Sequence, residues 1–340
     1  MLLLLSGCIE PTVLTESEYR LLDELRWREP SPEVPPAVQE GNEVWNVPEA
    51  AELGRRLYFD RGLSSDGTLS CDTCHHLATS GADPRGEPTS RGVDGAPSSR
   101  NAPTVFNAAL RGQYSWLAGE PSLWVQSGRP LLGFHGMTTE TVATHVCDAQ
   151  DAGYAEVFGD CEGTPPAEVF ANVTKAMAAY LQTLESRDSP FDRFMGQDRG
   201  SLDPSCLGEE ATRGARLFVG VASCNECHNG STLSDGRSYS IGAGLNGPPS
   251  APDGGLQRFQ TPTLRHISET APYMHDGSLP GLWDVLVYYR DGGAAGSGRA
   301  PEIQPLRLDD ADLLDLQAFL ESLRGAPLPY CWVFVVVRCS

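Results

Sequence analysis

The sequence predicts a mainly α-helical protein in which one structural unit occurs twice in tandem, with long Gly/Pro-rich loops inside each copy. Three observations predict this fold. A cysteine–histidine pentapeptide occurs twice, similar apolar segments flank both copies, and the chain carries 36 glycines and 26 prolines. Glycine and proline at this level predict long irregular connections without predicting a disordered chain.

Length and charge limit the class of protein. A chain of 340 residues suggests two domains, each large enough to bury an ordinary core. The chain has 25 Lys and Arg residues and 45 Asp and Glu residues, which gives a net charge of −20. Lys175 is the single lysine. This balance argues against a nucleic-acid partner. The composition, 40% apolar and 21% charged, is that of a soluble globular protein.

The pentapeptide is Cys71-Asp72-Thr73-Cys74-His75 in the first copy and Cys224-Asn225-Glu226-Cys227-His228 in the second. The pattern is typical of c-type haem attachment. On a helix, two thiols three residues apart can bond to the two vinyl groups of one haem, while the adjacent histidine binds the iron. A redox-active Cys-x-x-Cys pair or half of a zinc site is the alternative, and the histidine after both copies argues against it. The sequence therefore predicts two covalently bound haem c groups.

The surroundings of the pentapeptides repeat as well. Gly54-Arg55-Arg56-Leu57-Tyr58-Phe59 precedes the first, Gly214-Ala215-Arg216-Leu217-Phe218 precedes the second, and both predict an opening amphipathic helix. A closing helix is expected over 179–184 and again over 318–323, where leucines recur every three to four residues and predict an apolar stripe against the haem. These leucines are Leu313, Leu316, Leu320 and Leu323. Each unit is thus predicted to be a cytochrome c-like domain.

The proline at Ser189-Pro190 interrupts the helical pattern and predicts the domain boundary. We expect an N-terminal extension over 8–44, a first haem domain over 45–188 and a second over 189–328. A tail follows over 329–340. Its apolar stretch, Trp332 to Val337, is too short to span a bilayer and predicts a buried strand or a packed tail.

The first residues form a short apolar run that ends in Leu5-Ser6-Gly7-Cys8. This end resembles the lipobox of bacterial lipoproteins, in which a peptidase cuts before a cysteine that receives lipid. The usual basic segment is missing, so either the true start lies upstream or the match is accidental. We expect residues 1–7 to be a signal and Cys8 to be a lipid anchor, the protein's sole attachment to a membrane. A periplasmic or cell-envelope location follows from that expectation.

Further motifs carry a family resemblance. Arg100-Asn101-Ala102-Pro103-Thr104-Val105-Phe106-Asn107 follows the first pentapeptide. Thr261-Pro262-Thr263-Leu264-Arg265 and Ala271-Pro272-Tyr273-Met274-His275-Asp276-Gly277 follow the second. With these motifs the chain, from about Ala51 to Leu323, resembles the bacterial di-haem cytochrome c peroxidases. That family includes a MauG-like and MbnH-like branch that oxidises residues of partner proteins.

The resemblance implies roles for residues between the haems. Asn101, with the backbone carbonyls of Thr270 and Pro272, matches a calcium site that suits a hard cation. Asn101 alone is also typical of a turn or helix cap. Trp116 falls where the family keeps a tryptophan that can carry charge between the haems, although an isolated tryptophan is also typical of a core. Arg265 is a candidate partner for a buried haem propionate.

The resemblance also locates the sixth iron ligands. Arg91, with Val93 nearby, stands where many relatives have a removable histidine, so the first iron is predicted to be five-coordinate or bound by water and open to peroxide. Tyr289 stands where ordinary peroxidases have methionine and the MauG-like branch has tyrosine. A phenolate stabilises a high oxidation state, whereas a thioether favours reduced iron. The neighbouring Tyr288 leaves the register open, a packed helix aromatic is the alternative, and Met274 is a rival ligand.

Peroxide cleavage also needs a proton shuttle. Gln126 and Pro130 stand where residues of the first haem's distal pocket are expected, but the segment 131–137 lacks the family's glutamate. His135 could relay protons instead, or it could lie in a surface loop. The missing glutamate leaves open an impaired or non-enzymatic protein. We interpret His76 and His145 as structural or solvent-facing residues. His266 and His275 lie nearer the chemistry, but spacing alone gives them no role.

The remaining cysteines are consistent with an oxidising compartment. Cys147 with Cys161, and Cys331 with Cys339, are candidate disulfides, which leaves Cys206 unpaired. The connectivity cannot be derived from the sequence.

Three functions remain for the chain. The leading hypothesis is a MauG-like oxidoreductase that reacts with hydrogen peroxide, forms a high-valent iron state and oxidises a partner macromolecule by long-range electron transfer. The second is a cytochrome c peroxidase that reduces hydrogen peroxide with electrons from a small cytochrome or cupredoxin. The third is a non-catalytic di-haem electron-transfer protein, which the missing glutamate would favour.

Overall fold

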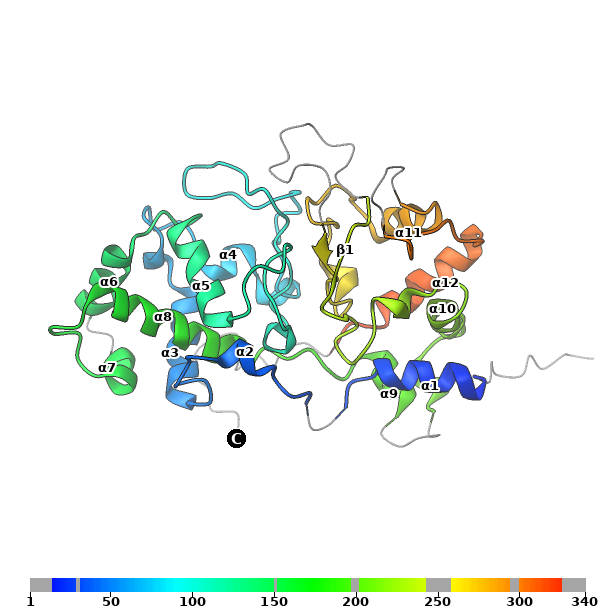
Figure 1. The fold of residues 1–340 in the computed structure, drawn as a ribbon, viewed down its shortest axis with the longest axis horizontal. Coiled ribbons are helices and arrows are strands. Elements are labelled where there is room, and N and C mark those ends of the chain that lie inside the picture. Colours follow the sequence, from blue (N-terminus) through cyan, green and yellow to red (C-terminus); the bar gives the residue numbers. More distant parts are fainter. Residues whose placement is uncertain are drawn as a thin grey trace, which may run out of the picture.

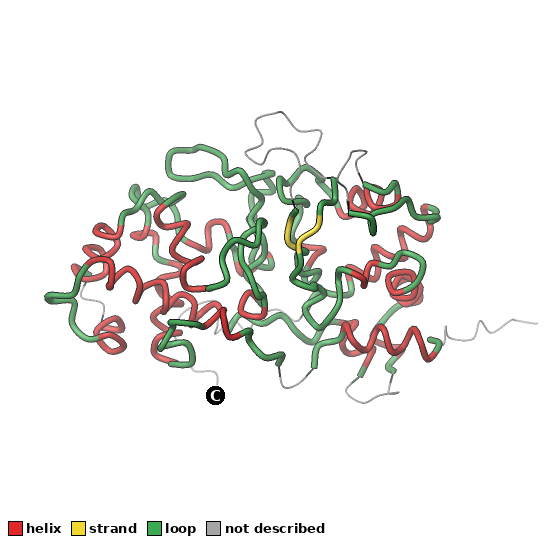
Figure 2. The backbone as a smooth tube through the Cα atoms, in the orientation of Figure 1, coloured by secondary structure: helices red, strands yellow, loops and turns green. Residues whose placement is uncertain are grey.

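The computed structural model describes residues 14–28, 31–149, 152–196, 202–242, 258–293 and 300–325. Two helical halves lie side by side, with loops and a short two-stranded ladder between them (Figures 1 and 2). The predicted mainly α fold is confirmed. The predicted signal with Cys8, and the tail with Cys331 and Cys339, lie outside the described residues.

The first half is built from seven helices and the second from five, among the described residues. Those of the first half are α2 (Pro36–Gln39), α3 (Pro48–Phe59), α4 (Cys71–Cys74), α5 (Leu123–Leu132), α6 (Thr139–Asp148), α7 (Ala152–Phe158) and α8 (Pro166–Leu181). Those of the second half are α1 (Glu16–Leu25), α9 (Pro190–Met195), α10 (Glu209–Val219), α11 (Leu282–Arg290) and α12 (Asp310–Glu321). Strands β1 (Ser238–Tyr239) and β2 (Phe259–Gln260) pair antiparallel.

The same helix pair forms the centre of both halves. Helix α3 crosses α8, and α10 crosses α12, each at a glycine of the opening helix. A Cβ atom on Gly54 would overlap the carbonyl oxygen of Ala176, and one on Gly214 would overlap that of Asp315. A side chain at either position would therefore force the two backbones apart.

Aromatic side chains pack beside each crossing in equivalent positions. The rings of Tyr58 and Tyr180 lie 5.5 Å apart in the first half, and those of Phe218 and Phe319 lie 5.1 Å apart in the second. The predicted correspondence of opening and closing helices is thereby confirmed. The leucine stripe of α12 is also buried, in the core that this helix shares with α10.

The N-terminal segment connects both halves, which the sequence did not indicate. Helix α1, which begins at a capping box between Thr15 and Glu18, buries its apolar face in the second core. Glu18 also forms an ion pair with Arg216 of α10 at 2.7 Å. The chain then crosses to the first half, where Val38 and Trp45 are buried (Figure 1). The extension is thus part of both domains' packing.

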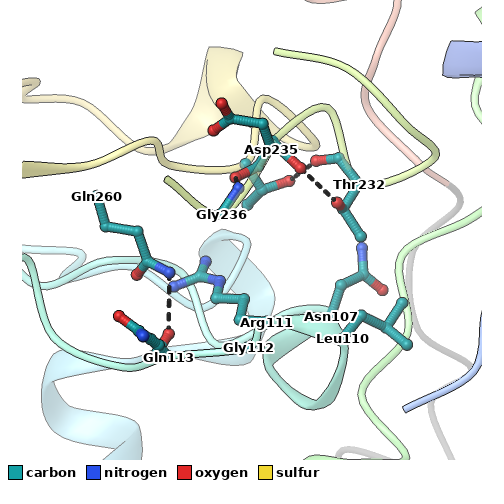
Figure 3. Close-up of a pocket in the computed structure, with 11 residues that line it drawn as sticks. Asn107, Leu110, Arg111, Gly112, Gln113, Thr232, Asp235, Gly236 and Gln260 are labelled. Atoms are coloured by element: carbon teal, nitrogen blue, oxygen red, sulfur yellow. Dashed lines mark hydrogen bonds between the residues drawn. The ribbon is translucent and has the colours of Figure 1, made fainter. Parts of the chain in front are cut away.

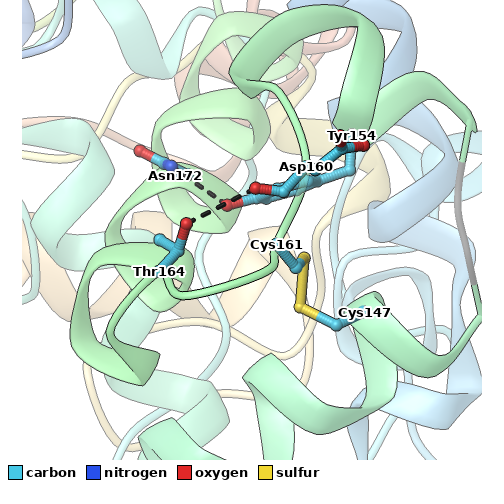
Figure 4. The surroundings of a disulfide bond; sticks show 6 residues. All are labelled: Cys147, Tyr154, Asp160, Cys161, Thr164 and Asn172. Atoms are coloured by element: carbon cyan, nitrogen blue, oxygen red, sulfur yellow. Dashed lines mark hydrogen bonds between the residues drawn. A yellow bond between two sulfur atoms is a disulfide. The ribbon is translucent and has the colours of Figure 1, made fainter.

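A disulfide bond joins the end of α6 to the loop before α8. Cys147 and Cys161 are bonded, with their Cα atoms 5.8 Å apart (Figure 4). This predicted pair is confirmed. Cys206 forms no disulfide with any cysteine in the described ranges.

No helix in the part of the chain that the structure describes has the length and apolar character needed to cross a membrane.

The close helix crossing can be tested with Gly54→Ala. Alanine raises helix propensity by about 1 kcal/mol, but here its methyl group meets a backbone oxygen that cannot rotate away. We expect the holoprotein to lose roughly 1–3 kcal/mol of stability, measured as a lower urea midpoint. Gly119→Ala is the control, because a Cβ atom there meets nothing within 4 Å. A Gly54→Ala variant as stable as wild type would contradict the prediction.

Candidate di-haem active site

The first pentapeptide forms one helical turn that presents two thiols and an imidazole. Cys71 and Cys74 begin and end α4, and His75 follows directly. The Nδ1–H of His75 donates to the carbonyl of Gly81 at 3.3 Å, which leaves Nε2 with a free lone pair. Burial lowers the pKa of His75, so the ring is neutral and able to bind a metal. The Tyr58 hydroxyl fixes the same turn by donating to the His75 carbonyl.

The second pentapeptide repeats this arrangement on a 3₁₀ turn, Cys224–Glu226, rather than on the α-helical turn that the sequence suggested. The Nδ1–H of His228 donates to the carbonyl of Leu233 at 3.0 Å, and burial lowers the pKa of this ring too. Both halves therefore offer an imidazole Nε2 beside a pair of thiols.

The thiols do not have the character of a redox pair or a zinc site. Burial and the neighbouring thiol raise the pKa of Cys71 to about 12. Burial and its own neighbour raise the pKa of Cys224 to about 12 as well. Redox-active and metal-binding cysteines need a lowered pKa, because the thiolate is the reactive form. In the described ranges, no group of three His, Cys, Asp or Glu residues could hold a metal ion.

Helix α11 carries the two tyrosines between which the sequence could not decide. The Tyr288 hydroxyl donates to the carbonyl of Ile241 at 2.7 Å, so this side chain is committed to the backbone. Tyr289 points elsewhere, with its ring perpendicular to that of Tyr288. Burial raises the pKa of Tyr289, and charge on Tyr288, Cys224 and Cys227 raises it further. Its hydroxyl therefore lies within electrostatic reach of the second pentapeptide.

The rival ligand Met274 belongs to a tight turn. Its backbone is left-handed, with φ of 72°, and its side chain is 9% exposed. The turn is closed by the backbone bonds between Tyr273 and Leu279. This position matches the packing role that the sequence suggested for Met274.

The region around the predicted distal side of the first haem contains a buried histidine. His135 is 4% exposed, and its Nδ1–H donates to the carbonyl of Leu63 at 2.7 Å. The surface-loop alternative for His135 is therefore wrong. The loop containing Val93 lies against this segment, because the Val93 amide donates to the carbonyl of Phe134 at 3.0 Å. Arg91 itself points to solvent and pairs with Glu87 at 2.7 Å.

Gln126 of α5 has an unsatisfied buried acceptor. Its Oε1 atom is buried without a hydrogen-bond partner in the structure. A buried acceptor of this kind needs a donor that the described residues do not supply, because leaving it unpaired costs about 1–3 kcal/mol. The atom is a candidate contact for a distal water or peroxide.

Trp116 lies where the two halves meet. Its indole N–H donates to the carbonyl of Asn101 at 2.9 Å, and its own carbonyl accepts from the Gln260 amide at 2.8 Å. The ring of His275, from the second half, stands edge-on to it at 6.4 Å. His275 also stacks on Phe259 at 3.7 Å.

Trp116 and His275 occupy equivalent positions in a turn that both halves share. Each turn contains a tyrosine whose hydroxyl donates to a carbonyl six residues earlier, Tyr114 to Ala108 at 2.9 Å and Tyr273 to Ile267 at 2.7 Å. The residue two positions after each tyrosine is Trp116 or His275. The sequence analysis missed this repeat, although the common tyrosine spacing signals it.

Comparisons with known proteins agree with this geometry. A family model for di-haem cytochrome c peroxidase matches residues 48–200. MauG, a methylamine utilization protein of Methylorubrum extorquens, is 33% identical over 290 residues, covering 83% of this chain and 80% of that protein. Cytochrome c551 peroxidase of Pseudomonas aeruginosa is 32% identical over 292 residues, covering 81% and 78%. The chain belongs to the di-haem cytochrome c peroxidase family.

A solved structure is similar as well. The crystal structure of a MauG-like protein associated with microbial copper homeostasis matches with a TM-score of 0.75 at 28% identity. The match covers 91% of this chain and 99% of that one. Together with the peroxidase relatives, this places the chain among the di-haem peroxidase-type oxidoreductases. The free thiols and the Nε2 atoms of His75 and His228 fit two haem c groups.

The predicted calcium ligands lie on segments that touch. The Asn101 amide donates to the carbonyl of His275 at 2.8 Å, and its side-chain Nδ2 donates to the carbonyl of Pro88 at 3.0 Å. Because Nδ2 is held in this way, Oδ1 remains the side chain's available ligand atom. Calcium binding by Asn101, Thr270 and Pro272 stays a prediction for this member of the di-haem peroxidase family.

Arg265 has a different partner from the predicted haem propionate. Its guanidinium is completely buried and binds Asp192 through two nitrogens, at 2.5 and 3.0 Å. The remaining donors go to the carbonyls of Ser231 and Leu25 and to the Ser189 hydroxyl. No N–H is left over, so the propionate prediction is corrected: Arg265 ties the N-terminal segment to the second haem domain.

The other histidines have protein partners. His76 pairs with Asp72 at 2.8 Å and His145 with Asp60 at 2.7 Å, as expected of structural residues. His266 binds the Ser80 hydroxyl at 3.0 Å across the two halves. Of these three histidines, His266 is the one to which the sequence spacing gave no role.

A cavity of about 290 Å³ lies between the halves of the peroxidase (Figure 3). The first half contributes the segment from Leu110 to Gln113, and the second half contributes Thr232, Asp235 and Gln260. A hydrogen bond from Gln260 Nε2 to the Gln113 carbonyl, at 3.1 Å, crosses the gap. Arg111 reaches from the first half toward Gln260 and Gly236.

The buried ion pair can be tested with Asp192→Asn, which leaves the Arg265 charge without compensation. We expect a loss of about 3–5 kcal/mol in holoprotein stability, measured by urea unfolding. Asp315→Asn is the control, because its partner Arg213 is 44% exposed and would stay solvated, so the loss should be roughly 0–1 kcal/mol.

The effect of Asp192→Asn should also depend on pH. Burial tends to raise the pKa of Asp192, but the charge and hydrogen bonds of Arg265 lower it overall. A lowered folded-state pKa gives stability that is present at neutral pH and lost as pH falls through that value. The difference between wild type and Asp192→Asn should therefore shrink in acid. Equal loss from both variants, or no pH dependence, would contradict the prediction.

Proposed function

We propose that the protein is a MauG-like oxidase, which uses hydrogen peroxide to withdraw electrons from a partner macromolecule through its own residues. The observation that carries the proposal is the commitment of Tyr288 to the Ile241 carbonyl, which leaves Tyr289 to face the second pentapeptide. Identity alone does not decide, because the MauG and peroxidase relatives are 33% and 32% identical.

Tyr289 and Arg91 distinguish the two activities. A phenolate ligand on the second iron would stabilise an oxidised state, whereas the methionine of ordinary peroxidases favours a reduced one. Arg91 is held at the surface by Glu87, so it provides no ligand that must be removed before peroxide binds. The similarity to a MauG-like protein associated with copper homeostasis supports the same branch.

The haems, when bound, supply the reduction of peroxide, in which two electrons and two protons convert one H₂O₂ into two waters. The protein's own residues supply the proton transfer and the electron path. His135 offers an unprotonated Nε2, because its Nδ1–H is used by the Leu63 carbonyl. Gln126 Oε1 offers a buried acceptor that can orient the hydroxyl of peroxide or water.

Trp116 provides the path between the halves. Its indole N–H donates to a backbone carbonyl, which is too weak a base to remove the proton. A brief oxidation of Trp116 would therefore leave the N–H in place and be reversed by the next electron. The edge-on ring of His275 and the hydrogen bond to Gln260 hold the indole against the second half.

The same proposal includes a location and an ion. The Cys147–Cys161 disulfide supports an oxidising compartment, and we propose the periplasm or cell envelope with Cys8 as a lipid anchor. Calcium bound by Asn101, Thr270 and Pro272 would fix Asn101 in place. The backbone of Asn101 bonds both to the Trp116 indole and to the His275 carbonyl.

The function can be tested with Tyr289→Phe and its matched control Tyr288→Phe. Resonance Raman and electron paramagnetic resonance should show altered ligation of the second iron in Tyr289→Phe alone. Stopped-flow mixing of the oxidised wild-type protein with peroxide should change the haem spectrum without prior reduction, and Tyr289→Phe should lose the long-lived oxidised state.

The other outcomes separate the alternatives. Unchanged ligation in Tyr289→Phe would remove the MauG-like proposal and leave the family intact. A requirement for pre-reduction, with rapid turnover when a small cytochrome or cupredoxin is supplied, would favour a cytochrome c peroxidase. No reaction with peroxide in either oxidation state would favour a non-catalytic electron-transfer protein.

The proton relay can be tested with His135→Gln. Removing a positioned base should slow the reaction with peroxide by about 10²–10⁴-fold. Burial lowers the pKa of His135 from 6.5, so the wild-type rate constant should fall with acid only below that pH. His145→Gln is the control, because His145 is paired with Asp60 on the outside of the first half. A rate unchanged in His135→Gln would assign the proton transfer to another group.

A further inference from the structure

Arg111 is a partly buried arginine at the domain interface without an acidic partner in the described part of the chain. It follows the 3₁₀ turn Ala108–Leu110 and lines the cavity between the halves. Among the described residues, its Nη2 donates to the Thr104 carbonyl at 3.1 Å. Asp235, which lines the same cavity, is occupied: its carboxylate accepts from the Tyr239 hydroxyl at 2.7 Å and from the Arg237 amide at 2.9 Å.

This arrangement is costly unless a negative charge comes from outside the polypeptide. Removal from water lowers the pKa of Arg111, which reflects the cost of holding its charge at this place. A charge taken out of water is tolerated when it is paired and hydrogen-bonded. Arg265 meets that condition through its ion pair with Asp192. Among the described residues, Arg111 has only a hydrogen bond to the Thr104 carbonyl.

The position of Arg111 points to the first haem as the source of the charge. Thr104, whose carbonyl accepts from Arg111, also donates through its hydroxyl to the Ser80 carbonyl at 2.5 Å, and the next residue, Gly81, accepts the Nδ1–H of His75 at 3.3 Å. The guanidinium is therefore bonded to the segment that holds the loop after the first pentapeptide. At the other end of the pentapeptide, the sulfur of Cys74 accepts from a different arginine, Arg85, at 3.4 Å. Thioether bonds at Cys71 and Cys74 would hold the vinyl edge of the porphyrin there, and the propionates project from the opposite edge.

We propose that Arg111 forms the ion pair with a propionate of the first haem, at the cavity between the two domains. The role that the sequence suggested for Arg265 thus falls to an arginine of the other domain. A charge-assisted bond to the propionate would fix the haem edge next to Gln260 and Thr232 of the second half. The guanidinium would also raise the reduction potential of the first haem, because a nearby cation favours the state with the additional electron.

The proposal is tested by redox titration of the holoprotein with Arg111→Gln and Arg111→Lys. In Arg111→Gln the midpoint potential of one haem should become more negative, and its pH dependence should move to higher pH because the propionate loses its cation. Arg111→Lys should stay close to wild type. Arg129→Gln is the control, since Arg129 is 53% exposed and pairs with Glu120 at 3.0 Å.

A crystal structure of the holoprotein then identifies the haem. A guanidinium nitrogen of Arg111 within about 4 Å of a propionate oxygen of the haem bonded to Cys71 and Cys74 supports the proposal. A guanidinium on a propionate of the second haem, on Asp235 or on water overturns it. Potentials in Arg111→Gln that equal those of wild type and Arg129→Gln overturn it as well.

Discussion

One hydrogen bond, made in the same way in both halves, determines what the rest of the structure can do. The Nδ1–H of each histidine that would bind haem donates to a carbonyl in the loop that follows, which leaves the Nε2 lone pair as the atom that would bind the iron. A threonine from the proline-containing motif further along the chain holds that loop, because its hydroxyl donates to a backbone carbonyl of the loop. These threonines are Thr104, bonded to Ser80 at 2.5 Å, and Thr263, bonded to Thr232 at 2.6 Å. The motifs after each pentapeptide thus act by fixing the imidazole.

The interface between the halves is made mostly from loops (Figure 2). The helices bury their apolar side chains in separate cores, one in each half. Loops can meet there only if their polar backbone groups are paired. The bonds from Asn101 to His275, from Trp116 to Asn101 and from Gln260 to Trp116 meet this requirement. The N-terminal segment adds a second connection, since α1 packs in the core of the second half and Val38 and Trp45 are buried in the first. The interface loops of the two halves are therefore joined by hydrogen bonds rather than by a shared apolar core.

The sequence identified what local spacing determines and missed what long-range contacts determine. The pentapeptides and the amphipathic helices beside them follow from patterns that can be read over a few residues, and Cys147 with Cys161 was a candidate pair that the structure confirms. Tyr288 and Tyr289 could not be separated, because their roles depend on Ile241, which is distant in the sequence. For His135 the sequence left a proton relay and a surface loop open, because its burial depends on Leu63, which is distant in the sequence. Arg265 was assigned to a propionate because nothing near it in the sequence reveals Asp192.

The proximal sides of the two haems are nearly the same, so any difference between the haems must arise on the distal sides. Burial lowers the pKa of His75 and of His228 alike, and each ring lies against two backbone carbonyls, those of Gly81 and Pro103 for His75 and those of Leu233 and Pro262 for His228. On the first distal side the proposed residues are Gln126, which can orient peroxide or water, and His135, which can move a proton. On the second the proposed ligand is Tyr289. A duplicated unit with one proximal design can therefore divide the work, with peroxide chemistry in one half and storage of oxidising equivalents in the other, by changing a few side chains that face the iron.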